Sequence, residues 1–161
     1  MGVLLPPDRV QVARGLMTQK GTDGDPTDVT TSAAVIDDFT NTVRADKITV
    51  TPGSGSFTVQ QDGLYRAIFN VSNHNGDADV VIDLRQNTSN IADGVIQVRN
   101  LGAGEGDVSI IFLGDHDFVA GDVIDLRWRT IANTDTFEFQ NNPGVSMAFS
   151  LEQIPRTIFR L

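Results

Sequence analysis

The sequence predicts an all-β protein, an antiparallel jelly-roll sandwich of about ten strands preceded by a non-globular N-terminal arm. From residue 35 onward, apolar and polar residues alternate with a period close to two, which is typical of strands buried on one face. Turn-forming pairs such as Asp62-Gly63 and Pro143-Gly144 separate these segments at short intervals. No helix-forming window competes within residues 35–154. We therefore expect residues 35–154 to form a single head domain.

The N-terminal residues 1–34 have no sustained period of either kind. Within them, residues 9–19 favour a short helix with Val10, Ala13 and Met17 on one face, which Gly15 weakens. Residues 20–31 are rich in turn and linker residues. We expect residues 1–34 to be an arm that orders against a partner, with disorder as the alternative. Residues 155–161 form a short basic and apolar tail.

The head is expected to consist of short strands joined by turns. The clearest alternation places Ile124, Leu126 and Trp128 on one face. The alternative for Trp128 is a sugar-binding platform. The expected strands are 35–41, 46–51, 56–60, 64–73, 79–86, 94–100, 107–114, 122–130, 136–140 and 145–154. The other residues expected to face inward are Val80, Ile82, Leu84, Val145, Met147, Phe149 and Leu151.

The hairpin at Asp62-Gly63 carries a second pattern, in which Phe57 is followed after five residues by Gly63, and then by Tyr65 and Phe69. This pattern resembles the signature of the complement-type globular head domain, which shares its jelly roll with tumour necrosis factor. Ala67 stands where that family has a further aromatic residue. The segments VAGDVIDLRW and VSMAFSLEQI resemble later strands of the family. The resemblance covers roughly residues 36–154 and implies a compact homotrimer.

Apolar residues at outward positions of alternating strands offer independent support for self-association. Ile111 and Leu113 share a strand whose other face is also apolar, and a strand apolar on both faces is usually covered on both. A closed threefold ring would supply the second cover. The alternative is scattered surface apolar residues, which are common. The expected trimer-interface residues are Ile68, Val81, Ile111, Leu113 and Ala148.

Composition narrows the possible functions of this 161-residue chain. Its net charge of −9 opposes binding to phosphate backbones, so we expect no nucleic-acid partner. No apolar run approaches the length of a membrane span, so we expect no membrane partner. The chain has no cysteine, which excludes thiolate chemistry. The short apolar segment before Pro6-Pro7 does not have the form of a signal peptide, which fits assembly in a cytoplasm.

The sequence offers little for catalysis or metal binding. His74 lies in a polar turn and His116 lies between two acids, and both are expected in solvated loops, with a metal site as the alternative. The segment LGAGEG lacks the lysine of a phosphate loop and is expected to be a hairpin tip. The acid pairs Asp37-Asp38, Asp77 with Asp79, and Asp122 with Asp125 are expected on the surface, with a structural Ca²⁺ as the alternative. We therefore expect no catalytic residue, no cofactor and no metal ligand.

These observations favour a structural, non-enzymatic protein of a virus particle, most simply of a phage. The expected role is a trimeric capsid decoration protein, assembled in the host cytoplasm, whose arm binds the major capsid protein or another virion protein. One alternative is a tail-fibre tip that recognises host glycans, and a lesser one is a jelly-roll enzyme. The residues expected to anchor the partner are Leu4, Leu5, Val10, Val12, Leu16, Met17, Arg156, Ile158 and Phe159.

Overall fold

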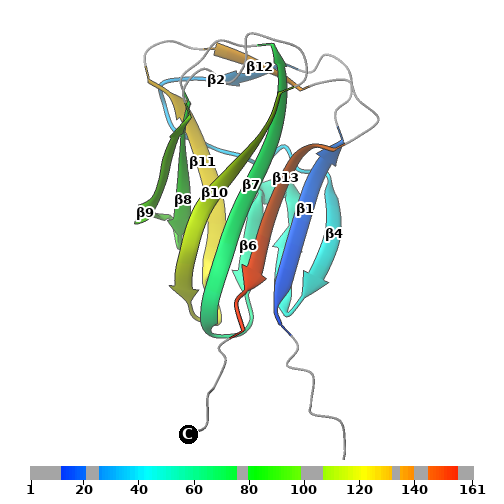
Figure 1. Ribbon diagram of the computed structural model, residues 1–161, viewed down its shortest axis with the longest axis vertical. Coiled ribbons are helices and arrows are strands. Elements are labelled where there is room, and N and C mark those ends of the chain that lie inside the picture. Colours follow the sequence, from blue (N-terminus) through cyan, green and yellow to red (C-terminus); the bar gives the residue numbers. More distant parts are fainter. Residues whose placement is uncertain are drawn as a thin grey trace, which may run out of the picture.

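The fold is known from a computed structural model that describes residues 12–20, 26–75, 80–98, 107–131, 135–139 and 145–155. Two antiparallel sheets face each other across one apolar core (Figure 1). Every strand pairing in the described residues is antiparallel. This arrangement confirms the predicted all-β jelly-roll sandwich.

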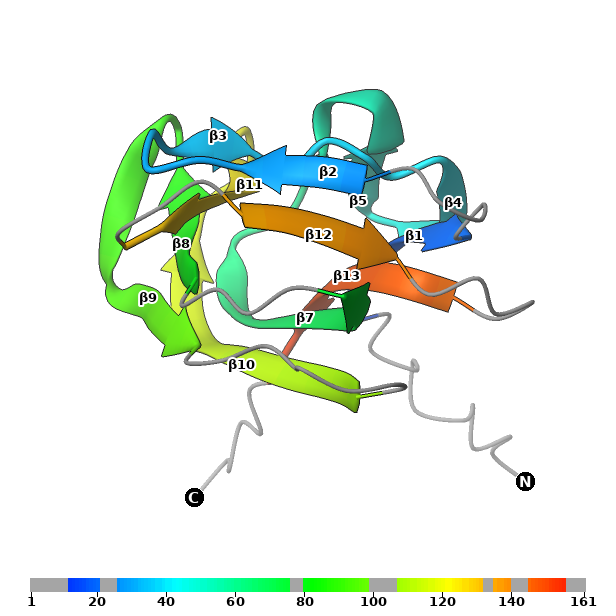
Figure 2. The ribbon, with the colours of Figure 1, turned by 90° about the horizontal axis from the view of Figure 1, so that it is seen from above.

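The seven-stranded sheet has the order β2-β12-β7-β13-β1-β4, with β10 also paired to β7. Its strands β2 and β12 lie across the upper end of the sandwich (Figure 2). The bounds of its strands are β1 Arg14–Lys20, β2 Pro26–Val29, β4 Asn41–Asp46, β7 Gly63–Asn75, β10 Asp107–Phe118, β12 Asp135–Phe139 and β13 Val145–Gln153.

The six-stranded sheet has the order β5-β6-β11-β8-β9, with β3 also paired to β11. A single 3₁₀ turn, Pro52–Ser54, joins β5 to β6, and the described residues contain no other helix. None of them forms a helix long and apolar enough to cross a membrane. The bounds of its strands are β3 Ala34–Val35, β5 Ile48–Thr51, β6 Ser56–Val59, β8 Val80–Gln86, β9 Ser89–Val98 and β11 Val123–Thr130.

The core between the sheets is built from the alternating side chains that the sequence predicted. The rings of Phe57 in β6 and Phe149 in β13 pack with centroids 4.7 Å apart, which joins the two sheets. Trp128 is only 3% exposed, so it belongs to the core and cannot serve as an exposed sugar platform. The other predicted inward residues that the structure describes are also buried: Val80, Ile82, Leu84, Ile124, Leu126, Met147, Phe149 and Leu151.

The prediction that residues 1–34 form a non-globular arm is wrong for those of them that the structure describes. Residues 14–20 form β1, which is hydrogen-bonded between β13 and β4, and no helix is present there. Ala13 and Met17 are fully buried in the core. Met17 was predicted to anchor a partner, but its strand position turns it toward the other sheet. The boundary expected at residue 34 is therefore no boundary between arm and head, because β1 and β2 are strands of the same sheet.

The strands β7, β9 and β10 also extend beyond their predicted limits. β9 begins at Ser89 because Asn87 and Thr88, both with positive φ, make a tight turn directly after β8. The predicted turn at Asp93-Gly94 lies inside this strand. β10 continues to Phe118, so His116 is a strand residue and not a loop residue. The expected strand 35–41 is instead divided between β3 and β4, with no strand between them.

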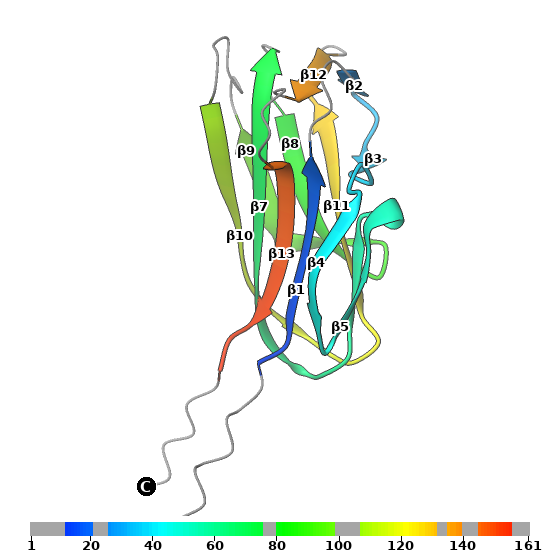
Figure 3. The ribbon, with the colours of Figure 1, turned by 90° about the vertical axis from the view of Figure 1, so that its right-hand side faces the viewer.

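The start of β1 and the end of β13 lie side by side at one end of the sandwich, which we call the base (Figure 3). Arg14 is opposite Glu152 in the register, and Gln153 N donates to Ala13 O at 2.8 Å. Residues 1–11 and 156–161 are therefore attached at neighbouring points of the base. This placement bears on how the domain is joined to any partner.

Candidate interaction surfaces

The outer face of the seven-stranded sheet carries a half-buried patch with short side chains at its centre. In one row across the sheet, Leu16 of β1 and Ile68 of β7 flank Ser150 of β13. In the next row, Thr18 and Asn70 flank Ala148. Ala148 and Ser150 of β13 have shorter side chains than Leu16, Ile68 and Asn70 on the neighbouring strands. We call these six residues the central patch: Leu16, Thr18, Ile68, Asn70, Ala148 and Ser150.

Asn70 gives the central patch a polar atom that the described part of the chain leaves unsatisfied. Its Oδ1 is buried and has no hydrogen-bond partner among the described residues. Nearby, the Ser150 hydroxyl donates to Ile68 O at 3.4 Å, so the serine is satisfied locally. A buried acceptor without a donor is unfavourable by about 1–3 kcal/mol. A second molecule that supplies an N–H or O–H group would remove that penalty.

A row of alternating charges borders the central patch on the side of the base. Five neighbouring strands place negatively and positively charged side chains opposite one another in alternation. In order across the sheet these are Asp46, Arg14, Glu152, Arg66 and Asp115. Arg14 Nε lies 2.6 Å from Glu152 Oε1. Arg66 donates to both carboxylate oxygens of Asp115, at 2.9 and 3.1 Å. Hydrogen bonding to Arg66 lowers the pKa of Asp115 below its usual range, although burial opposes it.

The five residues predicted for the trimer interface do not gather on one surface. Ile68 and Ala148 are half-buried diagonal neighbours in the central patch. Val81 alternates with core residues of β8 and therefore lies on the outer face of the other sheet, where it is 7% exposed. Ile111 is opposite Phe69 in the register, but its side chain lies outside the described part of the structure.

Leu113 was predicted to point outward, and this prediction is wrong. It is 1% exposed and belongs to the core. The register of β10 against β7 shifts between Phe112 and Gly114, so Leu113 is the extra residue of a β-bulge. Ile111, two residues earlier, is opposite the core residue Phe69, so the shift does not separate Leu113 from the phase of the preceding residues. Apolar residues occupy both sets of alternate positions in residues 110–113, and the sequence pattern therefore did not show which set faces the core.

The outer face of the six-stranded sheet carries charged side chains that are almost completely shielded from solvent. Arg85 of β8 and Asp125 of β11 form a bidentate ion pair, and their side chains are 5% and 10% exposed. Hydrogen bonding to Asp125 raises the pKa of Arg85, against the effect of burial. Asp83 is buried beside this pair, 4.0 Å from Arg129 Nε. These contacts join two adjacent strands of one sheet, so they are structural contacts.

The candidate metal and catalytic residues are engaged in structural contacts where the structure describes them. His116 Nε2 lies 2.9 Å from Leu113 O, and its ring packs near Phe118. Asp122 accepts hydrogen bonds from Gln86, Asn87 and the Val119 amide, while its neighbour Asp125 binds Arg85. The described residues contain no group of three metal-ligating side chains. The side chain of His74, residues 101–106, Asp77 and Asp79 lie outside the description.

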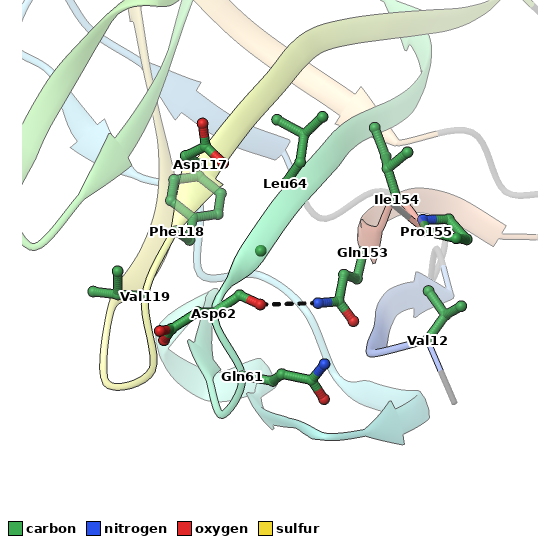
Figure 4. A pocket seen from close by; sticks show the side chains of 11 residues that line it. Val12, Gln61, Asp62, Leu64, Asp117, Phe118, Val119, Gln153, Ile154 and Pro155 are labelled. Atoms are coloured by element: carbon green, nitrogen blue, oxygen red, sulfur yellow. Dashed lines mark hydrogen bonds between the residues drawn. The ribbon is translucent and has the colours of Figure 1, made fainter. Parts of the chain in front are cut away.

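A hollow of about 410 Å³ opens at the base, where Val12 and Pro155 are among its lining residues (Figure 4). One wall of the hollow is formed by Asp117, Phe118 and Val119 at the end of β10. The opposite wall is formed by Val12, Ile154 and Pro155. The turn between β6 and β7, with Gln61, Asp62 and Gly63, forms a third side, and Leu64 and Gln153 complete the lining. The partner anchor Val12, predicted from the sequence, thus lines this hollow. Leu16 lies in the central patch, and the remaining predicted anchors Leu4, Leu5, Val10, Arg156, Ile158 and Phe159 lie outside the described residues.

Comparison with known proteins identifies the fold. No protein-family model matches the chain, and no curated protein matches it in sequence. Murine APRIL at pH 5.0 superimposes with a TM-score of 0.55 and 10% identity, covering 89% of this chain and 100% of that one. Eiger TNF from S. frugiperda gives a TM-score of 0.50 and 12% identity, covering 93% of this chain and 97% of that one.

These similarities extend over nearly the whole of each compared chain, so the likeness concerns the complete domain and not one motif. The predicted resemblance to the tumour necrosis factor jelly roll is therefore confirmed at the level of the fold. At such low identity the likeness carries no residue-level role. The virion origin predicted from the sequence gains no support from these structures and stays a prediction. The chain has the fold of a tumour-necrosis-factor-like jelly roll.

Proposed function

We propose that the chain is a non-enzymatic contact protein that assembles as a homotrimer through its central patch. The observation that carries this proposal is Asn70 Oδ1, a buried acceptor without a donor on an outer sheet face lined by Leu16 and Ile68. Self-association would supply the missing donor and cover the apolar side chains. A closed threefold arrangement gives each subunit the same environment.

The outer face of the six-stranded sheet is a weaker candidate for the same contact. Arg85 and Asp125 on that face are already paired with each other, although Arg127 Nε there is also buried and has no hydrogen-bond partner among the described residues. The central patch is favoured because it combines an unsatisfied acceptor with the apolar side chains of Leu16 and Ile68, whose burial is favourable, whereas burying charged side chains costs desolvation. The flanking charge row further gives the central patch a polar margin, as protein interfaces commonly have.

The biological setting that we propose is the surface of a virus particle, where the trimer decorates the capsid. Residues 1–11 begin next to Val12 at the base and carry Leu4, Leu5 and Val10. In a trimer with parallel subunits, three such segments leave from the same end. Three linked contacts bind far more tightly than one, because the second and third become intramolecular. The major capsid protein or another virion protein is the proposed partner.

Two experiments separate these proposals. Sedimentation equilibrium of the purified chain should give three times its 17.4 kDa mass. Ile68→Lys or Ala148→Lys should yield monomers, while Val123→Lys, on the outer face of the other sheet, should leave the trimer intact. A wild-type monomer at micromolar concentration would disprove the trimer. Removal of residues 1–11 should abolish binding to purified capsids but leave the mass unchanged, and full binding by that variant would exclude the proposed anchor.

A further inference from the structure

The hollow at the base is apolar and partly open. Phe118 is buried at its floor, and Leu64 and Ile154 are half-buried. Val119 at its rim is 56% exposed. Scattered exposed apolar residues need no explanation, but these four line one concave site together with Val12 and Pro155. The site therefore favours an apolar occupant.

The walls of this hollow are fixed by hydrogen bonds that need no occupant. Gln153 Nε2 donates to Asp62 O at 3.1 Å, and Gln153 Oε1 accepts from Ala13 N at 3.2 Å. Asp62 Oδ1 accepts from Ala120 N at 2.8 Å. A Cβ atom on Gly63 would collide with the Gln153 amide, so the glycine makes room for this bridge. The hollow is preformed, as ligand-binding pockets commonly are.

The charge of the hollow selects for a cationic occupant. Asp62 and Asp117 lie on its exposed margin, and none of its described lining residues is a lysine or an arginine. Lys47 Nζ donates to the Oε1 atom of the lining residue Gln61 at 3.0 Å, but Lys47 is not itself a lining residue. A segment that combines arginine with large apolar side chains matches this combination of acid rim and apolar floor.

We propose that residues 156–161 of the same chain occupy this hollow. The segment reads RTIFRL, with two arginines and three large apolar residues in an otherwise acidic chain of net charge −9. It is attached to Pro155, which is itself a lining residue. Six residues reach about 20 Å when extended, more than enough to turn back over the site. A segment tethered at the rim has an effective local concentration near millimolar, which favours it over a free peptide.

This inference goes beyond the proposed function, because it places the tail on its own domain and not on a partner. Residues 1–11, attached beside it at Val12, then remain as the segment available to a partner. The tail would cover Val119, Ile154 and Leu64. Arg156 and Arg160 would lie near Asp62 and Asp117.

The test uses the full chain and a truncated chain that ends at Pro155, with thermal unfolding to verify that both fold. A fluorescein-labelled peptide of residues 156–161 is titrated into each and followed by fluorescence anisotropy. The truncated chain should bind saturably, and the full chain should bind at least about tenfold more weakly because its own tail competes. Val119→Lys in the truncated chain should weaken binding by about tenfold. Val43→Lys, an equally exposed valine on β4, should leave it within about twofold.

Three results would overturn the inference. The first is no saturable binding to the truncated chain, and the second is equal binding to both chains, which would leave the hollow open for another protein. The third is a weaker binding of the peptide by the full chain that is seen only at high protein concentration and is lost when the protein is diluted. That result would mean that the tail occupies the hollow of a second copy of the chain. The peptide titration does not depend on the trimer. If the wild-type chain is a monomer, the proposed homotrimer is disproved, but the expected peptide-binding affinities stay the same.

Discussion

Arg85 donates two hydrogen bonds to the Asp125 carboxylate across adjacent strands, from Nε to Oδ1 at 2.6 Å and from Nη2 to Oδ2 at 2.7 Å. Its Nη1 also reaches Thr88 O at 3.4 Å, in the turn that joins β8 to β9. The pair lies on the outer face of the six-stranded sheet, yet it is nearly as inaccessible as the core. It therefore fixes β8 to β11 and to the following turn.

Arg85→Met should lower the free energy of unfolding by more than the loss of the Arg85 hydrogen bonds alone would. The change leaves Asp125 buried without its cation, which is unfavourable by about 3 kcal/mol or more. The double variant Arg85→Met/Asp125→Leu should regain most of this loss, because it removes both charges. Urea unfolding measures the free energies. Arg44→Met, which breaks an exposed pair with Asp46, is the control and should change stability by less than about 1 kcal/mol. Equal losses for Arg85→Met and Arg44→Met would contradict the interpretation.

Asp122 should make the stability of the domain depend on pH in the acid range. Burial raises its pKa, but hydrogen bonds from the Val119 amide, Asn87 and Gln86 outweigh burial and leave the pKa lowered from 3.8. A lowered folded pKa means that the stabilisation is complete above the unfolded value and is lost as the pH falls through the folded one. Unfolding free energies between pH 5 and 2 should therefore decrease on acidification.

Asp122→Asn is the variant that tests this dependence. It should destabilise the domain at pH 7, because an amide nitrogen would face donor groups, and it should flatten part of the decrease below pH 4. Asp37→Asn changes an exposed acid and serves as the matched control. An Asp122→Asn variant with an unchanged pH profile would show that other carboxylates carry the acid sensitivity.

Strands that bury one face were predictable from the sequence, as β11 illustrates. Ile124, Leu126 and Trp128 alternate with polar residues and all three are buried. The signal exists because burial of one face imposes a period of two on the chain itself. For the same reason β8, with Val80, Ile82 and Leu84 inward, was predicted almost to its ends.

The surfaces could not be predicted, because they depend on strand order and register. The charge row unites Asp46, Arg14, Glu152, Arg66 and Asp115 from five strands, and alternation within a strand contains no information about its neighbours. Leu113 was misassigned because residues 110–113 are apolar at both sets of alternate positions, so alternation alone does not show which set is buried. β1 was missed because residues 14–20 contain Gly15 and lack a strict period of two. This strand forms because it pairs with β4 and β13, and the pairing with β13, near the other end of the chain, cannot be read from the local sequence.

Gly15→Ala should destabilise the domain through a clash and not through backbone strain. A Cβ atom at residue 15 would lie 2.8 Å from the Phe57 ring and 3.0 Å from Ile48 Cγ2. Overpacking of this kind commonly costs about 1–3 kcal/mol. Phe57→Leu alone should also destabilise, but Gly15→Ala/Phe57→Leu should lose less than the sum of the two changes, because the smaller side chain makes room. Gly53→Ala meets nothing within 4 Å and is the control for thermal unfolding. Strict additivity of the two changes would exclude the clash.

Glu152→Lys should weaken the seven-stranded sheet in a salt-dependent way. Glu152 lies between Arg14 and Arg66 in the charge row, so a lysine there would place three cations side by side. Like charges directly opposite each other in a sheet are unfavourable by a few tenths to about 1 kcal/mol. These side chains are about half exposed, so salt should screen the repulsion. The stability difference from wild type should therefore be largest at about 20 mM salt and small at about 1 M.

Glu152→Gln is the matched control for that experiment, since it removes the charge without reversing it. Its effect should be smaller than that of Glu152→Lys at low salt, and the two should converge at high salt because repulsion is the part that screening removes. A loss in Glu152→Lys that persists unchanged at 1 M salt would mean that packing of the side-chain stem, and not the alternation of charge across the five strands, accounts for the stability at this position.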